Sequence, residues 1–241
     1  MSDASVRISE LYNLRLRDLT PAPARQAARV LYAPISHDVE VSKLCASILS
    51  GDELLKKDRL GAACDKALFE QRRAFRRFCG ATALGSSEPL SKIVFEETVK
   101  GRPYLAESPD LWFSFSSCPT GLLGAWSSTH AIGIDLEDST RDLEAKELAR
   151  QYFLVAEAEA VEAAGRCQRL STFYRFWSLK EAALKSIGEG LPYGLQAFEF
   201  ELEPRLRVVH ALPDHGGPER FGAYAIEETD SCAALVIRSR T

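Results

Sequence analysis

The segment Ile132–Glu137 alternates hydrophobic residues with glycine or acidic residues, in the order Ile-Gly-Ile-Asp-Leu-Glu. In a β-strand this alternation buries the hydrophobic side chains and places Gly133, Asp135 and Glu137 together on the other face. Two carboxylates on one strand face repel each other unless a cation or a basic partner lies between them. Their oxygens suit Mg²⁺, which takes one or two carboxylates together with substrate phosphates. A solvated strand edge would also account for this pair.

A second segment, Phe176–Lys185, has the residues of a helix and carries Glu181 and Lys185 one turn apart. Such a pair is commonly an ordinary surface ion pair, which contributes about 0.2–0.5 kcal/mol. The alternative is chemical: Glu181 serves as a third metal ligand or a general base, and Lys185 contacts a phosphate. Taken alone, this segment favours the ordinary surface ion pair.

The surrounding sequence predicts an α+β fold that positions these residues. Residues 1 to about 27 are polar, and we expect them to be partly loose. A first strand is expected at 30–35, a helical region at about 41–79 that glycines 80 and 85 end, and short strands at 92–98, 111–115 and 122–127. The second half predicts a strand at 131–137, helices at 144–164 and 172–187, and an antiparallel meander of four strands over 197–238.

The two halves have similar length and element order, which indicates pseudo-two-fold duplicated α/β halves. We expect each half to be a small antiparallel sheet with packed helices, and a ligand cleft to lie between them. The expected organisation is an N-terminal extension over 1–28, an N-terminal half over 29–128, and a C-terminal half over 129–241 that holds the metal and catalytic motifs.

The composition is that of a soluble globular protein: 241 residues, 46% hydrophobic, with a net charge of −4. The overall charge does not favour nucleic acid as a partner, although the basic segment 56–77 could hold a phosphorylated ligand. The six cysteines are scattered, so we expect free thiols in a reducing cytoplasm. No hydrophobic run approaches the length of a membrane span, and we expect a cytoplasmic protein.

Together and in this order, the two segments resemble the surfactin-type 4′-phosphopantetheinyl transferase family. Its signature is a strand of the Ile132–Glu137 type, followed about 40 residues later by a Trp-Ser-x-Lys-Glu-Ala-x-x-Lys helix, which is here Trp177–Lys185. Three further segments match the family: Gly101-Arg102-Pro103 its Gly-Lys-Pro loop, 113–118 its Phe-Asn-x-Ser-His-Ser strand, and 188–191 the segment after the helix. The resemblance covers about residues 29 to 238.

The resemblance implies transfer of 4′-phosphopantetheine from coenzyme A to a serine of an apo acyl or peptidyl carrier protein, with release of 3′,5′-ADP. Such carriers serve fatty acid, polyketide or nonribosomal peptide biosynthesis. Mg²⁺, with Mn²⁺ as a substitute, would be held by Asp135, Glu137 and Glu181. The implied catalytic residues are Glu181, Asp135 and Lys185, and the implied coenzyme A contacts are Lys56, Arg73, Arg102, Ser116, Ser117 and Lys185. We expect a monomer with no nucleic-acid or membrane partner.

One departure from the family pattern concerns the Ser-His-Ser segment, in which Ser117 stands for the histidine and Cys118 for the final serine. Ser114 also replaces the asparagine. Either a contact with the ligand has been lost, so that Ser117→His would tighten coenzyme A binding, or a cation of segment 56–77 compensates. The main alternative function is a non-catalytic paralogue that binds coenzyme A or a carrier protein. A different Mg²⁺ enzyme, such as a hydrolase, is the other alternative, and no P-loop or kinase motif supports it.

Overall fold

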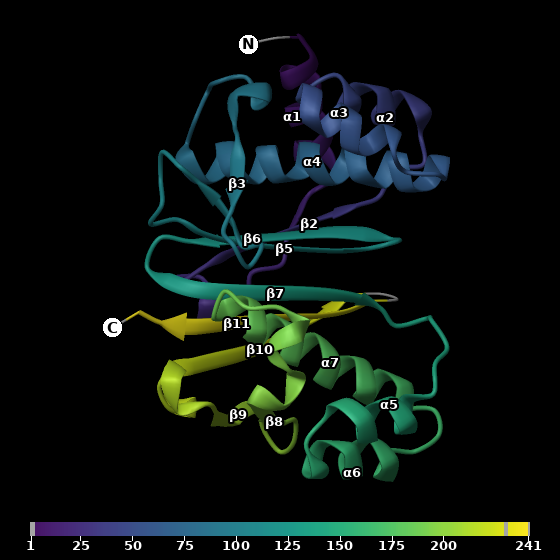
Figure 1. Cartoon of the computed structure of the whole chain (residues 1–241), viewed down its shortest axis with the longest axis vertical. Coiled ribbons are helices and arrows are strands. Elements are labelled where there is room, and N and C mark those ends of the chain that lie inside the picture. Colours follow the sequence, from purple (N-terminus) through teal and green to yellow (C-terminus); the bar gives the residue numbers. More distant parts are fainter. Residues whose placement is uncertain (1–2, 229–230, 241) are drawn as a thin grey trace.

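The computed structural model describes residues 3–228 and 231–240, and their elements form two halves stacked on each other (Figure 1). The N-terminal half contains α1 (Asp3–Arg15), β1 (Arg17–Asp18), β2 (Arg29–Pro34), α2 (Val39–Ala46), α3 (Gly51–Asp58), α4 (Ala63–Leu84), β3 (Phe95–Glu97), β4 (Pro103–Leu105), β5 (Trp112–Cys118) and β6 (Gly121–Ser127). The C-terminal half contains β7 (His130–Asp138), α5 (Ala145–Tyr152), α6 (Val155–Ala163), α7 (Arg169–Ser186), β8 (Phe198–Glu201), β9 (Arg207–Ala211), β10 (Phe221–Glu228) and β11 (Ser231–Ser239). Short 3₁₀ turns lie at Ala22–Ala24, Leu90–Lys92, Leu191–Tyr193, Leu195–Ala197, Pro213–His215 and Pro218–Arg220.

The two halves share one topology. In each, the last strand pairs antiparallel with the first strand on one side and with the strand before it on the other, giving the orders β2-β6-β5 and β7-β11-β10. β1 extends the first sheet beyond β2. Along the chain, a long helix (α4 or α7) and then a two-stranded hairpin (β3–β4 or β8–β9) come between the first strand of these three-strand orders and the last two. This arrangement confirms the predicted α+β class and its duplicated halves.

The sheets of the two halves face each other, with the helices on their outer sides (Figure 1). Strand alternation explains this layering, because β2 turns Val30 and Tyr32 toward the C-terminal sheet and Leu31 and Ala33 toward its own helices. The isoleucines and leucine of Ile132–Glu137 are buried in the shared core between the sheets, as the alternation predicted. The other face of β7 is therefore turned toward α7.

The N-terminal segment is ordered, and the expectation of a partly loose segment is wrong for residues 3–15. These residues form α1, whose Ile8 is fully buried and whose Tyr12 hydroxyl donates to the Gln71 carbonyl at 3.1 Å. Only a few hydrophobic residues of this helix, at helical spacing, pack against the core. In a polar sequence so few residues are a weak indication of a helix.

Five further differences concern the bounds, number or pairing of the elements. α4 runs through Gly80 to Leu84, because a Cβ at Gly80 would lie 2.7 Å from the Ile93 side chain and the glycine serves close packing. α7 begins at Arg169 rather than at 172, and the expected helix 144–164 is interrupted at Phe153. The four C-terminal strands form two separate hairpins instead of one meander. The strand β4 had not been expected.

Two predictions from composition can be compared with the structure. All six cysteines are free, as expected. Over residues 3–228 and 231–240, no helix has the length and hydrophobicity needed to span a bilayer.

Candidate active site

A glycine brings β7 and α7 into close contact at the site. A Cβ on Gly133 would lie 1.9 Å from the Ala182 carbonyl oxygen and 2.5 Å from the Ser186 nitrogen, so only glycine fits here. Two residues further along the same strand face, Asp135 meets the Lys185 side chain of α7. The glycine of the strand motif therefore sets the distance between the acidic strand and the basic end of the helix.

Asp135 lies at the centre of the site and is only 2% exposed. Its Oδ1 accepts a hydrogen bond from Lys185 Nζ at 2.6 Å and another from Ser116 Oγ at 2.9 Å. Its Oδ2 is buried and has no hydrogen-bond partner. Ser116 belongs to β5, so both halves contribute to the site. A buried carboxylate oxygen without a partner is costly and suits a position where a cation binds.

Two more carboxylates lie near Asp135. Glu181 accepts from the Trp177 indole N–H at 3.1 Å, and its other oxygen lies 3.5 Å from Lys185 Nζ. Burial and the nearby Asp135 charge raise the pKa of Glu181, and Lys185 offsets part of that effect. Burial, together with the charges of Asp135 and Glu181, raises the pKa of Glu137 to about 7. In the described part of the chain, the ammonium group of Lys185 is thus the one positive charge that acts on all three acidic side chains, Asp135, Glu137 and Glu181.

Among the residues that the structure describes, Lys185 is the only cationic side chain in contact with these carboxylates. Burial alone would lower the pKa of Lys185, but Asp135 and Glu181 raise it, so the ammonium stays charged. As the side chains stand, no group of three or more His, Cys, Asp or Glu residues in segments 3–228 and 231–240 is arranged to hold a metal ion. The Lys185 ammonium bridges Asp135 and Glu181 instead. The donor set is nevertheless all oxygen, which fits Mg²⁺.

The raised pKa of Glu137 predicts a pH dependence of stability. Its pKa is about 7 in the folded protein and 4.5 ordinarily, so the folded state binds the extra proton between these values. The contribution of Glu137 to the free energy of unfolding should therefore fall as the pH rises from about 5 to 7, and then level off. Melting temperatures of the metal-free protein and of Glu137→Gln test this, since the variant should gain stability relative to the parent as the pH rises. A constant difference between them from pH 5 to 8 would contradict the prediction.

A basic cavity of about 210 Å³ adjoins the carboxylates. Its lining includes Arg76, Lys100, Arg102 and Lys185. The Arg102 guanidinium lies 4.1 Å from the Trp112 ring centroid, and its Nη1 is buried without a hydrogen-bond partner. Burial and the nearby Arg240 lower the pKa of Arg102. A buried guanidinium nitrogen with no acceptor indicates a place for an anion.

A second cavity, of about 270 Å³, shares Arg76 and Phe115 with the first. It is also lined by Arg72, Ser116 and Ser117. Around the carboxylates and these two cavities the structure thus brings together seven of the residues singled out from the sequence: Arg102, Ser116, Ser117, Asp135, Glu137, Glu181 and Lys185.

The two remaining predicted contacts lie elsewhere. Lys56 is exposed on α3, and the Arg73 guanidinium lies 3.6 Å from the Glu53 carboxylate; neither residue lines the two cavities. Arg72 and Arg76, which do line them, were not singled out from the sequence. The i,i+4 spacing of Arg72 and Arg76 places them on one helix face, but Arg73 and Arg77 have the same spacing and both bind Glu53. Only the position of Glu53 distinguishes the two pairs.

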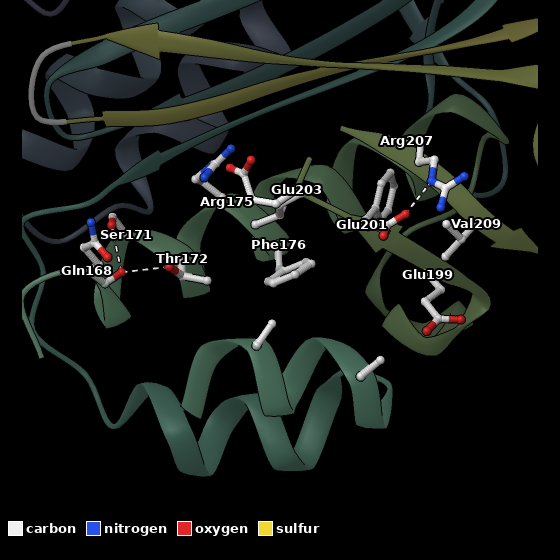
Figure 2. Close-up of a pocket in the computed structure, with 14 residues that line it drawn as sticks. Gln168, Ser171, Thr172, Arg175, Phe176, Glu199, Glu201, Glu203, Arg207 and Val209 are labelled. Atoms are coloured by element: carbon white, nitrogen blue, oxygen red, sulfur yellow. Dashed lines mark hydrogen bonds and ion pairs between the residues drawn. The ribbon is translucent and has the colours of Figure 1, made fainter. Parts of the chain in front are cut away.

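A larger cavity, of about 710 Å³, lies between α6, α7 and the β8–β9 hairpin (Figure 2). Its labelled polar residues include Arg175, Glu203 and the ion pair of Arg207 with Glu201. Phe176 lines it, but none of the predicted catalytic, metal-binding or coenzyme A residues does. The carboxylates and the unpartnered polar atoms therefore identify the candidate site better than cavity size does.

Comparison with known proteins agrees with the motifs at this site. A family model described as the 4′-phosphopantetheinyl transferase superfamily matches residues 131–231. The chain is 34% identical over 164 residues to the 4′-phosphopantetheinyl transferase HetI of Nostoc sp., an alignment that covers 66% of this chain and 67% of HetI.

Two Bacillus relatives match over a shorter region. Identity is 29% with the 4′-phosphopantetheinyl transferase psf-1 of Bacillus pumilus, over 58% of each chain. It is 30% with the 4′-phosphopantetheinyl transferase Sfp of Bacillus subtilis, over 57% of this chain and 60% of Sfp. The matches thus span between 58% and 67% of the lengths of these three relatives. The resemblance found in the sequence is confirmed, and the chain belongs to the 4′-phosphopantetheinyl transferase superfamily.

Proposed function

We propose that this chain transfers the 4′-phosphopantetheine group of coenzyme A to a serine of an apo acyl or peptidyl carrier protein and releases 3′,5′-ADP. The observation that carries the proposal is the meeting of Asp135, Glu137, Glu181 and Lys185 beside the two basic cavities. Family membership supports it. The duplicated halves at 29–128 and 129–241, preceded by the segment 1–28, are the units between which we place coenzyme A.

Mg²⁺, or Mn²⁺ in its place, would be held by Asp135, Glu137 and Glu181. The buried, unpartnered Oδ2 of Asp135 and the crowding that raises the pKa of Glu137 both support a cation here. When bound, the ion would neutralise charge on the pyrophosphate and on the departing 3′,5′-ADP. The Lys185 ammonium would turn from Asp135 toward a phosphate oxygen.

The other residues bind and orient the reacting groups. Arg102 and Lys185 would hold the pyrophosphate, and the serine hydroxyl oxygen of the carrier would attack its pantetheine-side phosphorus. A P–O bond forms there, the bond to the adenosine-side phosphate oxygen breaks, and that oxygen leaves with the electron pair. Glu181 is the candidate base for the hydroxyl proton, because its raised pKa suits proton transfer near neutral pH. In the alternative mechanism, Glu181 acts only as a metal ligand and solvent accepts the proton of the serine hydroxyl.

Incubation with coenzyme A, Mg²⁺ and a panel of apo carrier proteins tests the proposal. Intact-protein mass spectrometry should show the mass of one phosphopantetheine group added to at least one carrier, with no addition when its acceptor serine is replaced by alanine. Binding of coenzyme A without a mass gain on any carrier would favour the non-catalytic paralogue instead.

Arg102→Gln is expected to weaken coenzyme A binding about tenfold or more, because a charge-assisted contact with phosphate is lost. The affinity should also depend less steeply on salt than in the parent. Calorimetric titration at several salt concentrations measures both effects. Arg59→Gln is the charge-matched control, since Arg59 is exposed at the end of α3 and lines neither cavity. Equal losses in the two variants would contradict the assignment of Arg102.

A further inference from the structure

We infer that the ion pair between Lys100 and Glu189 is a strap that positions Arg102 for coenzyme A. Lys100 lies in the turn of the β3–β4 hairpin of the N-terminal half, and Glu189 follows α7 in the C-terminal half. The pair therefore joins the two halves beside the cavity that Arg102 and Lys185 line. The inference rests on the proposed function, and it adds two positioning residues to the substrate site.

The turn that carries Lys100 is closed by its own hydrogen bonds. The Thr98 N–H donates to the Arg102 carbonyl at 3.0 Å, and the Gly101 N–H donates to the Thr98 carbonyl at 2.8 Å. The Thr98 hydroxyl accepts from the Arg102 N–H at 3.1 Å. Gly101 has a φ of 85°, which glycine adopts without strain. Because Lys100 and Arg102 belong to one closed turn, a restraint on Lys100 also restrains the Arg102 backbone.

The segment that carries Glu189 is fixed in a similar way. The Glu189 N–H donates to the Leu184 carbonyl at 3.0 Å, and the preceding Gly188 has a φ of 77°. This is the Schellman motif, in which a left-handed glycine ends a helix. Lys185 lies in the last turn of the helix that ends here. The strap therefore ties the hairpin of Arg102 to the helix end that carries Lys185.

Packing, rather than a carboxylate, holds the Arg102 side chain. Within the segments that the structure describes, Arg102 has no ion-pair partner, and its Nη1 is buried without an acceptor. Its guanidinium stacks on Trp112 at 4.1 Å from the ring centroid. A Cβ on Gly188 would lie 4.0 Å from both Arg102 Cδ and the Trp112 ring, so the helix end borders this stacked pair. The position of Arg102 thus depends on how closely the hairpin approaches the helix end, and the strap sets that approach.

The cavity is made by the two segments that the strap joins. Its lining includes residues 100–103 of the hairpin together with Lys185 and residues 188–190 of α7 and its cap. Its volume is about 210 Å³. Pockets for drug-sized ligands usually have about 300–1,000 Å³. In so small a cavity, a shift of the hairpin relative to the helix end would change the spacing of Arg102 and Lys185 around the bound phosphates.

A direct contact of Lys100 with the ligand would have the opposite consequence for one substitution. Glu189 is the one carboxylate in the described lining of this cavity. If Lys100 bound the pyrophosphate itself, Glu189 would only compete for its ammonium group, and Glu189→Gln would tighten coenzyme A binding. If the pair is a strap, Glu189→Gln weakens binding although it removes a negative charge. The sign of the change therefore separates the two roles.

Calorimetric titration with coenzyme A in Mg²⁺, without a carrier, measures this change. Glu189→Gln and Lys100→Gln should each weaken binding about two- to fivefold, the effect expected of a partly exposed ion pair. The exchanged protein Lys100→Glu/Glu189→Lys should recover most of the lost affinity, because the pair is restored in reverse. Glu40→Gln and Lys43→Gln are the matched controls, since their ion pair is exposed on α2 and lines neither cavity.

A double-mutant cycle tests whether the strap acts through Arg102. In an Arg102→Gln background, Glu189→Gln should have almost no further effect on coenzyme A affinity, because the side chain that the strap positions is already gone. A general loss of stability would instead weaken binding by the same factor in both backgrounds.

Four results would overturn the inference. They are tighter coenzyme A binding by Glu189→Gln, parental affinity in both single variants, additive losses in the cycle with Arg102, and no recovery in an exchanged protein that melts at the parental temperature. Failure of the parent to bind coenzyme A would instead reject the proposed function itself.

Discussion

Asp135→Asn is expected to reduce phosphopantetheinyl transfer by about three orders of magnitude. Asp135 is the carboxylate that contacts Lys185 and Ser116 and still has an unpartnered buried oxygen. Asparagine keeps the shape and can still accept from Ser116, but it removes the charge that would hold the metal. A metal ligand of this kind supplies several kcal/mol of transition-state stabilisation, and each 1.4 kcal/mol is about a tenfold change in rate.

The variant should remain folded, since Lys185 retains Glu181 as a partner and one of three mutually repelling carboxylates is gone. Turnover at saturating Mg²⁺ and the Mg²⁺-induced rise in melting temperature are the two measurements. Both should be nearly absent in Asp135→Asn. Asp138→Asn is the matched control on the same strand, because the Asp138 carboxylate only caps a turn through Thr140. Wild-type turnover by Asp135→Asn would reject the metal assignment.

The strand and helix of the site could be predicted because their signals are local. Strand alternation in Ile132–Glu137 and helical spacing in Phe176–Lys185 fix which side chains share a face, and the structure has both elements at nearly the expected positions. The contact between them could not be predicted in the same way. It depends on Gly133 meeting the backbone of α7, which is a property of two segments about fifty residues apart.

The basic residues of α4 show where local reasoning stops. Four arginines, 72, 73, 76 and 77, follow one another in two i,i+4 pairs, and the sequence does not say which pair faces a ligand. Glu53 of α3 selects Arg73 and Arg77 as its partners, and the other pair lines the cavity. Helix α1 is a similar case, because its burial depends on the helices against which Ile8 and Tyr12 pack.

Lys180 is the residue of the helix motif whose role the sequence did not reveal. It precedes Glu181, but its side chain points to the other side of α7 and is completely buried. Its ammonium pairs with Glu157 at 2.6 Å and donates to the carbonyls of Leu195 and Phe198. All three of its N–H groups thus have acceptors, and they join α7 to α6 and to the start of β8.

Glu157 is equally well satisfied. Its oxygens also accept from the backbone N–H groups of Leu154 and Phe200, at 3.0 and 2.9 Å. Burial raises the pKa of Glu157 and lowers that of Lys180, and their mutual attraction opposes both shifts. Each member therefore depends on the other, since either charge alone would be buried without a partner.

Lys180→Met is accordingly expected to lower the free energy of unfolding by about 3–5 kcal/mol, the usual cost of leaving one member of a buried ion pair alone. Urea denaturation measures it. Lys146→Met is the matched control, because the Lys146–Glu162 pair, at 3.6 Å, is partly exposed to solvent and its loss should cost less than about 1 kcal/mol. The double variant Lys180→Met/Glu157→Gln should lose less than the sum of its single variants, since no unpaired charge is left. Strict additivity, or a Lys180→Met as stable as the parent, would show that the buried pair does not hold α7 in place.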